Sequence, residues 1–218
     1  EAELQEIYRK ARESAGRFDC DVALVGILPT LTKANLGLDS MVPTPRYHAL
    51  NAAICAMRGK EFGFTINGID QLLVQHDNVM LEACNTSFQL HLQIDPDDFI
   101  QSYNWSQAIS GPILAVSTNS PLLLGRELWA ETRIALFQQS IDTRNTSYAL
   151  KYQRPRVSFG KRWATGTVAD IFKDNIAEYP IILSTHLEGN ALEEVQQGQI
   201  PKLKALALHS GTIYPWNR

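Results

Sequence analysis

The sequence predicts an α+β fold in which an antiparallel sheet packs against helices. Short stretches with an apolar residue at every second position are interspersed with stretches of helical periodicity. The dipeptide Asn67-Gly68, which lies between two short alternating stretches, is a strong signal for a β-hairpin. The chain has no glycine-rich loop that could cradle a phosphate, so neither a P-loop nor a dinucleotide-binding fold is supported.

Length and composition exclude several classes of protein. The 218 residues are most simply one domain spanning residues 1–218. Lys and Arg number 20 against 23 Asp and Glu, and the basic residues are scattered, which argues against nucleic-acid binding. No apolar run approaches the ~20 residues that a membrane span needs. The cysteines, Cys20, Cys55 and Cys84, have apolar neighbours and no Cys-x-x-Cys spacing, which predicts buried, reduced thiols in a cytoplasmic protein.

The first third of the chain predicts a helix over residues 1–17 that ends at Gly16, and a helix over residues 46–57. Residues 21–28 are almost continuously apolar, which predicts a central strand covered on both sides. Residues 30–45 are rich in Gly, Pro, Asn and Asp and predict a loop. Residues 62–74 predict the hairpin, and the alternative is a strand broken by a bulge. We expect His76 to be structural, with Asp77 orienting its ring.

Residues 87–95 alternate strictly, which predicts a strand with one polar face carrying Gln89 and His91. Residues 79–84 either extend this strand or form a helical turn. Asp95, Asp97 and Asp98 then predict a turn and the start of a helix, because carboxylates favour helix N-termini. A long, mostly apolar run follows and ends at the tripeptide Asn119-Ser120-Pro121.

The next stretch, residues 122–139, predicts a loop followed by a helix. Arg126 and Arg133 are seven residues apart, so on one helix they would share a face about two turns apart. Two guanidinium groups on one face suit recognition of phosphate or carboxylate. An equally weighted interpretation makes them surface charges paired with Glu127 and Glu131.

The last third begins with a polar, basic stretch at residues 143–165, which is typical of a solvated face and would also suit an active-site flap. Residues 167–179 predict a helix that Pro180 stops. Residues 203–214 predict two short strands on either side of Ser210-Gly211.

Several stretches together resemble the bacterial glutamate-cysteine ligase family, of the carboxylate-amine ligase type. They are VGILPTL at 25–31, PRYHALN at 45–51, NGIDQLLVQHD at 67–77, EACNTSFQLHLQID at 82–95, TNSPLLLGRELWAETR at 118–133 and LHSGTIYPWNR at 208–218. The resemblance implies a glutamine-synthetase-like fold whose antiparallel sheet forms a basin. It also implies an ATP- and Mg²⁺-dependent enzyme that joins the side-chain carboxylate of glutamate to an amine through an acyl phosphate.

The resemblance also implies site residues. His91 would lie next to the metal and the nucleotide phosphates, and Gln89 stands where the family has a first histidine. Asn119, Ser120 and Pro121 match the helix-ending turn of the family, and Asn119 and Ser120 would bind the cofactor. Arg133 matches an arginine expected to neutralise phosphate or substrate carboxylate, and Arg126 is a looser match for a second catalytic cation.

The resemblance further implies that a metal-binding Glu-x-Glu strand precedes residue 1 and that an arginine-containing strand follows residue 218. We therefore expect a central fragment of a larger catalytic domain that is inactive alone. The partners implied are small molecules, glutamate and an amino-acid amine, with no nucleic acid or membrane, and a homo-oligomer is left open. Because Gln89 replaces a histidine, the alternative is a catalytically silent ligand-binding or scaffold domain of the same fold.

Overall fold

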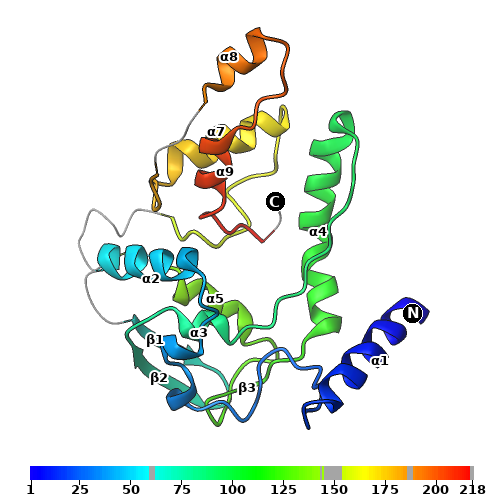
Figure 1. The fold of residues 1–218 in the computed structure, drawn as a ribbon, viewed down its shortest axis with the longest axis vertical. Helices are drawn as coiled ribbons and strands as arrows, with labels where there is room; N and C mark the ends of the chain where they lie inside the picture. The colour runs from blue at the N-terminus through cyan, green and yellow to red at the C-terminus, as the bar shows by residue number, and fades with distance from the viewer. Residues whose placement is uncertain (59–61, 143, 145–153, 186–188, 217–218) are drawn as a thin grey trace.

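The computed structural model describes residues 1–58, 62–142, 144, 154–185 and 189–216 (Figure 1). Its strands are β1 (Phe62–Asn67), β2 (Gln71–His76), β3 (Leu122–Leu123) and β4 (Arg126–Glu127). Its short 3₁₀ helices are η1 (Lys33–Asn35), η2 (Leu38–Ser40) and η3 (Pro96–Asp98). Its α-helices are α1 (Ala2–Gly16), α2 (Pro45–Arg58), α3 (Met80–Ala83), α4 (Phe99–Ser117), α5 (Arg133–Ser140), α7 (Val168–Glu178), α8 (Ala191–Gln196) and α9 (Lys204–Ser210).

The predicted α+β class is confirmed, with helices packed around small antiparallel sheets. The hairpin forms at the predicted place, with β1 and β2 in register from Phe62↔His76 to Asn67↔Gln71. Gly68 in its turn is required sterically, because a Cβ there would lie 2.5 Å from the backbone of Leu128. This close approach joins the hairpin to the second one, since the Asp70 N–H donates to the Glu127 carbonyl at 2.7 Å.

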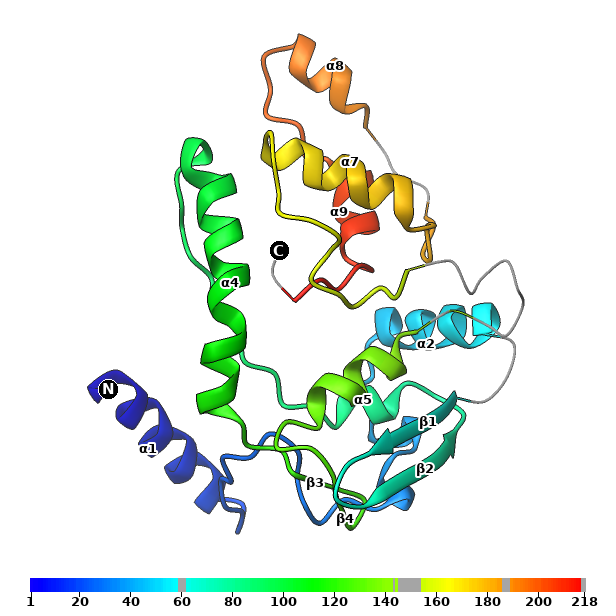
Figure 2. The same cartoon turned by 180° about the vertical axis from the view of Figure 1, so that it is seen from behind.

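The hydrophobic core includes residues of this hairpin and of the helices α2, α3 and α5. Figure 2 shows α2 and α5 beside the hairpin from behind. Phe64 and Ile66 of β1 are 1% exposed and meet side chains such as Leu81 of α3 and Leu136 of α5. Outside this body, α1 and α4 contain no buried residue. None of the helices described is long and apolar enough to cross a membrane.

Several predicted helices are confirmed: α1 ends at Gly16, α2 covers residues 46–57, and α7 lies within residues 167–179. At the start of α7, Thr167 and Asp170 form a capping box, in which each side chain bonds the backbone N–H of the other residue. Residues 79–84 form a helical turn, α3. Asp95 caps η3 as predicted, because its carboxylate accepts a hydrogen bond from the Asp97 N–H at 2.9 Å.

The predictions of strands over residues 21–28 and 87–95 are wrong. These residues belong to no strand, and Leu24 and Phe88 are 76% and 81% exposed. Among the backbone hydrogen bonds of the described residues, one joins the two segments, in which the Thr86 N–H, just before the second segment, donates to the Gly26 carbonyl at 2.9 Å. Alternation defines a strand only when a neighbour supplies ladder hydrogen bonds, and no neighbouring strand lies beside these segments in the part of the chain described.

The prediction of two strands over residues 203–214 is also wrong, because residues 204–210 form α9. Ala, Leu and Lys dominate this stretch and are strong helix formers. A tertiary contact then fixes the helix, since the buried ring of His209 bonds the Tyr179 carbonyl through Nε2 at 2.9 Å.

The cysteines differ from one another in burial. Cys84 is buried as predicted, Cys55 is half-buried, and Cys20 is exposed, so the prediction of three buried thiols is wrong for Cys20. The burial of Cys84 raises its pKa to about 11, which makes its thiolate rare at neutral pH.

Candidate functional site

Arg133, the first residue of α5, joins three segments that are far apart in the sequence. Its Nε and Nη2 donate to the two carboxylate oxygens of Glu131, each at 2.6 Å. Nη2 also donates to Asn119 Oδ1 at 2.8 Å, and Nη1 donates to the Thr86 carbonyl at 2.6 Å. The guanidinium therefore holds the start of segment 86–95 against the turn at Asn119.

Glu131 is the buried centre of this arrangement, with only 5% of its surface exposed. Besides the guanidinium, its Oε1 accepts a short hydrogen bond from the hydroxyl of Ser120, which is 1% exposed. Burial acts to raise the pKa of Glu131, but the hydrogen bonds from Arg133 and Ser120 outweigh burial and lower it. The carboxylate is therefore ionised at neutral pH, and its hydrogen bond raises the pKa of Arg133.

Gly26 completes what we call the Arg133 cluster, which comprises Gly26, Thr86, Asn119, Ser120, Glu131 and Arg133. The Gly26 N–H donates to the Asn119 carbonyl at 3.3 Å. A Cβ at Gly26 would lie 2.6 Å from Asn119 Oδ1 and 3.0 Å from Arg133 Nε. A side chain at residue 26 would therefore force Asn119 and Arg133 out of these positions.

The structure brings together three of the predicted site residues, Asn119, Ser120 and Arg133. The pairing of Arg133 with Glu131 in the equally weighted interpretation is also confirmed, but Glu131 is buried and so is not the surface charge that this interpretation expected. Arg126 is different: it lies exposed on β4, so the prediction that it shares a helix face with Arg133 is wrong. Leu124 and Gly125 have φ of 49° and 74°, and these left-handed residues turn the chain between β3 and β4 before α5 begins.

His91 and Gln89 lie exposed on the unpaired segment 86–95. No hydrogen bond or ion pair of the described residues joins either side chain to the Arg133 cluster. A metal site around His91 is likewise incomplete, because the described residues contain no group of three His, Cys, Asp or Glu side chains that could hold an ion.

Sequence reasoning missed the role of Glu131, which it treated only as a surface partner of Arg133. Nothing in the local pattern distinguishes Glu131 from an exposed residue, because its hydrogen-bond partner Ser120 lies eleven residues earlier in the sequence. The available signal was the Asn119-Ser120-Pro121 turn, which backbone hydrogen bonds join to Ala130 and Thr132 on either side of Glu131.

The basic stretch at residues 143–165 is described only in part, since residues 143 and 145–153 lie outside the described residues. Within the rest, Lys161 and Arg154 pair with Glu178, and Arg162 pairs with Asp174 at 3.0 Å. These ion pairs join the described part of the stretch to α7. Such pairs are compatible with the predicted solvated face.

The arrangement limits what Arg133 can do chemically. A guanidinium has five N–H donors, and four hydrogen bonds from Arg133 go to Glu131, Asn119 and Thr86. One N–H remains for a ligand, and the adjacent carboxylate neutralises the charge. The cluster is therefore well built to position segment 86–95 and the Asn119 turn, and it offers a single directed donor beside them.

Comparison with known proteins gives one family. The model of glutamate-cysteine ligase family 2 matches residues 1–156 of this chain. The matched region includes the whole Arg133 cluster and segment 86–95. Searches of curated proteins and of solved structures returned no match.

Proposed function

Because this chain belongs to glutamate-cysteine ligase family 2, we propose that it serves the ATP-dependent joining of the glutamate side-chain carboxylate to an amine. The family implies a ligase of the glutamate-cysteine type. In the proposed reaction a carboxylate oxygen attacks the γ-phosphorus of ATP and ADP leaves. The amine nitrogen then attacks the acyl carbon, and phosphate leaves as the amide forms.

The observation that carries the proposal is the Arg133 cluster within the family match. The cluster fixes the position of Thr86 at the start of segment 86–95. Gln89 and His91 lie three and five residues after this fixed point. We assign Gln89 and His91 to the nucleotide phosphates, together with the Asn119-Ser120 turn. Arg133 would direct its remaining N–H to the transferred phosphoryl group or the substrate carboxylate. Arg126, which is exposed on β4, would supply a second cation.

The described residues do not form a complete Mg²⁺ site. His91 is one nitrogen ligand, whereas Mg²⁺ prefers oxygen ligands and is commonly bound by carboxylates, substrate phosphates and water. A metal ion near His91 would therefore take its other ligands from the nucleotide, from water and from residues outside the described part of the chain.

The test is calorimetric titration of the chain with Mg-ATP. If His91 contacts the phosphates, His91→Ala should weaken binding about tenfold, the effect of losing one hydrogen bond to a charged group. The matched control is His48→Ala, which removes another exposed imidazole from α2 and should leave the affinity unchanged. Equal affinity of the wild type and His91→Ala would contradict the assignment of His91.

One observation favours a second candidate function, a catalytically silent domain that binds a ligand or acts as a scaffold. Most of the donors of Arg133 are already committed to protein acceptors, and the described residues gather no metal ligands. A wild-type chain that binds no Mg-ATP in the same titration would favour this second function.

A further inference from the structure

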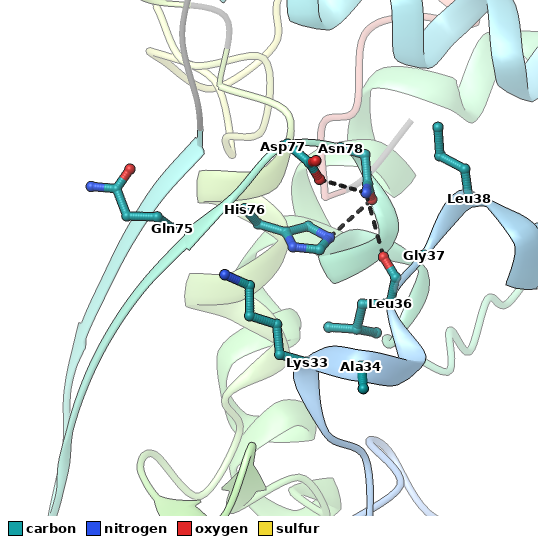
Figure 3. A pocket seen from close by; sticks show the side chains of 9 residues that line it. All are labelled: Lys33, Ala34, Leu36, Gly37, Leu38, Gln75, His76, Asp77 and Asn78. Atoms are coloured by element: carbon teal, nitrogen blue, oxygen red, sulfur yellow. Dashed lines mark hydrogen bonds between the residues drawn. The ribbon is translucent and has the colours of Figure 1, made fainter.

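A separate pocket lies between η1 and the end of β2 and has a volume of about 460 Å³. Its lining combines Lys33, Leu36 and neighbouring residues of the 3₁₀ segment with residues 75–78 (Figure 3). The volume falls within the range of small-molecule sites. The pocket shares no lining residue with the Arg133 cluster.

The side chain of Asn78 lies at this pocket, is 7% exposed and is held by several hydrogen bonds. Its Oδ1 accepts a hydrogen bond from the Met80 N–H at 2.8 Å. Because a backbone N–H can only donate, this bond identifies the oxygen end of the amide. The Nδ2 end donates to the Leu36 carbonyl at 3.4 Å and to Asp77 Oδ1 at 2.8 Å.

The fixed amide also determines the tautomer of His76, whose ring is 6% exposed. Nε2 of His76 lies 2.9 Å from Asn78 Oδ1, so Nε2 carries the proton and donates it. In the neutral ring Nδ1 therefore keeps its lone pair, and it has no partner among the residues described. Asn78, and not Asp77 as predicted, orients this histidine. Figure 3 shows the ring between Asn78 and Lys33.

Two opposite charges face the same pocket. The exposed ammonium of Lys33, at the start of η1, pairs with no carboxylate in the described chain. Asp77 uses Oδ1 to accept from Asn78, and its other oxygen receives no hydrogen bond from any described residue. The apolar part of the wall comes from Ala34, Leu36 and Leu38.

We propose that this pocket binds a small zwitterion, a free α-amino acid whose carboxylate meets Lys33 and whose ammonium meets Asp77 and His76 Nδ1. An ammonium group supplies the donors that the carboxylate and the imidazole lone pair lack. A ligand with one charge would gain one of these contacts and face repulsion from the other charge of the pocket. The proposal is independent of the nucleotide chemistry proposed for segment 86–95.

The experiment is titration of the ¹⁵N-labelled chain with L-alanine, followed through the amide signals of Gly37, Asp77 and Asn78. We expect saturable shifts of these signals, and at least tenfold weaker binding in Lys33→Met and in Asp77→Asn. Both substitutions alter exposed side chains, so the fold should be retained. Lys173→Met, which removes an exposed ammonium from α7, is the matched control and should bind like the wild type.

Propionate and ethylamine, each with one charge of alanine, should bind at least tenfold more weakly than alanine. Propionate or ethylamine binding as tightly as alanine would overturn the zwitterion assignment. Absence of saturable shifts at these amides, or unchanged affinity in both pocket variants, would overturn the site itself. No nucleotide is present, so failure here is distinguishable from failure of Mg-ATP binding.

Discussion

Glu131 is a buried carboxylate whose negative charge is stabilised by two neighbours, the Arg133 guanidinium and the Ser120 hydroxyl. Burying a charge is costly unless it is paired and hydrogen-bonded. Removing the charge while keeping the shape should therefore leave Arg133 without its counter-charge. Removal of the Glu131 charge should therefore lower the free energy of unfolding, and its effect should not be limited to substrate binding.

We expect Glu131→Gln to lower the free energy of unfolding by about 2 kcal/mol at neutral pH, because it breaks a buried ion pair. Urea denaturation monitored by circular dichroism measures this change. Glu127→Gln, at an exposed carboxylate of β4, is the control and should change stability by less than about 0.5 kcal/mol. Equal stabilities of the two variants would mean that the buried pair contributes nothing.

The pH dependence of the same pair follows from the lowered pKa of Glu131. A carboxyl group whose pKa is lower in the folded state stabilises the protein above its unfolded pKa, about 4.3 for Glu. This stabilisation is lost as the pH falls through the lower, folded value. The difference in unfolding free energy between the wild type and Glu131→Gln should therefore shrink as the pH is lowered below about 4. If the difference in unfolding free energy between the two proteins stayed constant with pH, the ionised Glu131 carboxylate would not be its source.

Residue type and spacing singled out Arg133, and the family resemblance added Asn119 and Ser120; the structure places these three residues together. The pairing of Arg133 with Glu131, which was one of two interpretations, is present in the structure, and a contact of Arg133 with phosphate or carboxylate stays a prediction. The contribution of Gly26 was not predictable, since a glycine within an apolar run has many roles. Its close approach to Asn119 and Arg133 depends on how distant segments pack.

At the scale of elements, sequence patterns predicted correctly those helices and hairpins whose hydrogen bonds lie within the element itself. The β1–β2 hairpin and helices α1, α2 and α7 carry their own hydrogen bonds, turns or caps, so turn chemistry and periodicity predicted them. Residues 21–28 and 87–95 also have strand-like patterns, but a strand needs a neighbour that the pattern does not specify. In α9, helix propensity and the His209–Tyr179 contact outweigh the apparent alternation.

The amides of residues 88–94 should therefore exchange with solvent much faster than those of the β1–β2 hairpin, because they form no ladder hydrogen bonds. Hydrogen–deuterium exchange followed by mass spectrometry compares the two directly, with the hairpin peptide as the internal reference. Protection of residues 88–94 equal to that of the hairpin would show that this segment pairs as a strand in solution.

At the scale of the whole molecule, residues beyond the family match pack onto its core. Phe137 of α5 lies edge-on to Tyr214, with ring centroids 5.8 Å apart, and at the same centroid distance from Trp216. The backbone extends this contact, since the Tyr214 N–H donates to the Arg156 carbonyl at 3.0 Å. Arg156 itself is 3% exposed and donates to the Thr212 and Pro180 carbonyls. Burial lowers its pKa.

That residues 1–218 form one domain stays a prediction, and Phe137→Ala tests it at this aromatic contact. Loss of a half-buried aromatic ring should lower the free energy of unfolding by about 2 kcal/mol. If the domain is single, unfolding should remain one transition, with coincident urea curves from far-ultraviolet circular dichroism and tryptophan fluorescence. Phe18→Ala, at a ring that is 77% exposed, is the control and should leave the midpoint nearly unchanged. Separate transitions in Phe137→Ala would instead show that the helices α7 and α9 unfold apart from the core, because the aromatic contact would then be a link between two units.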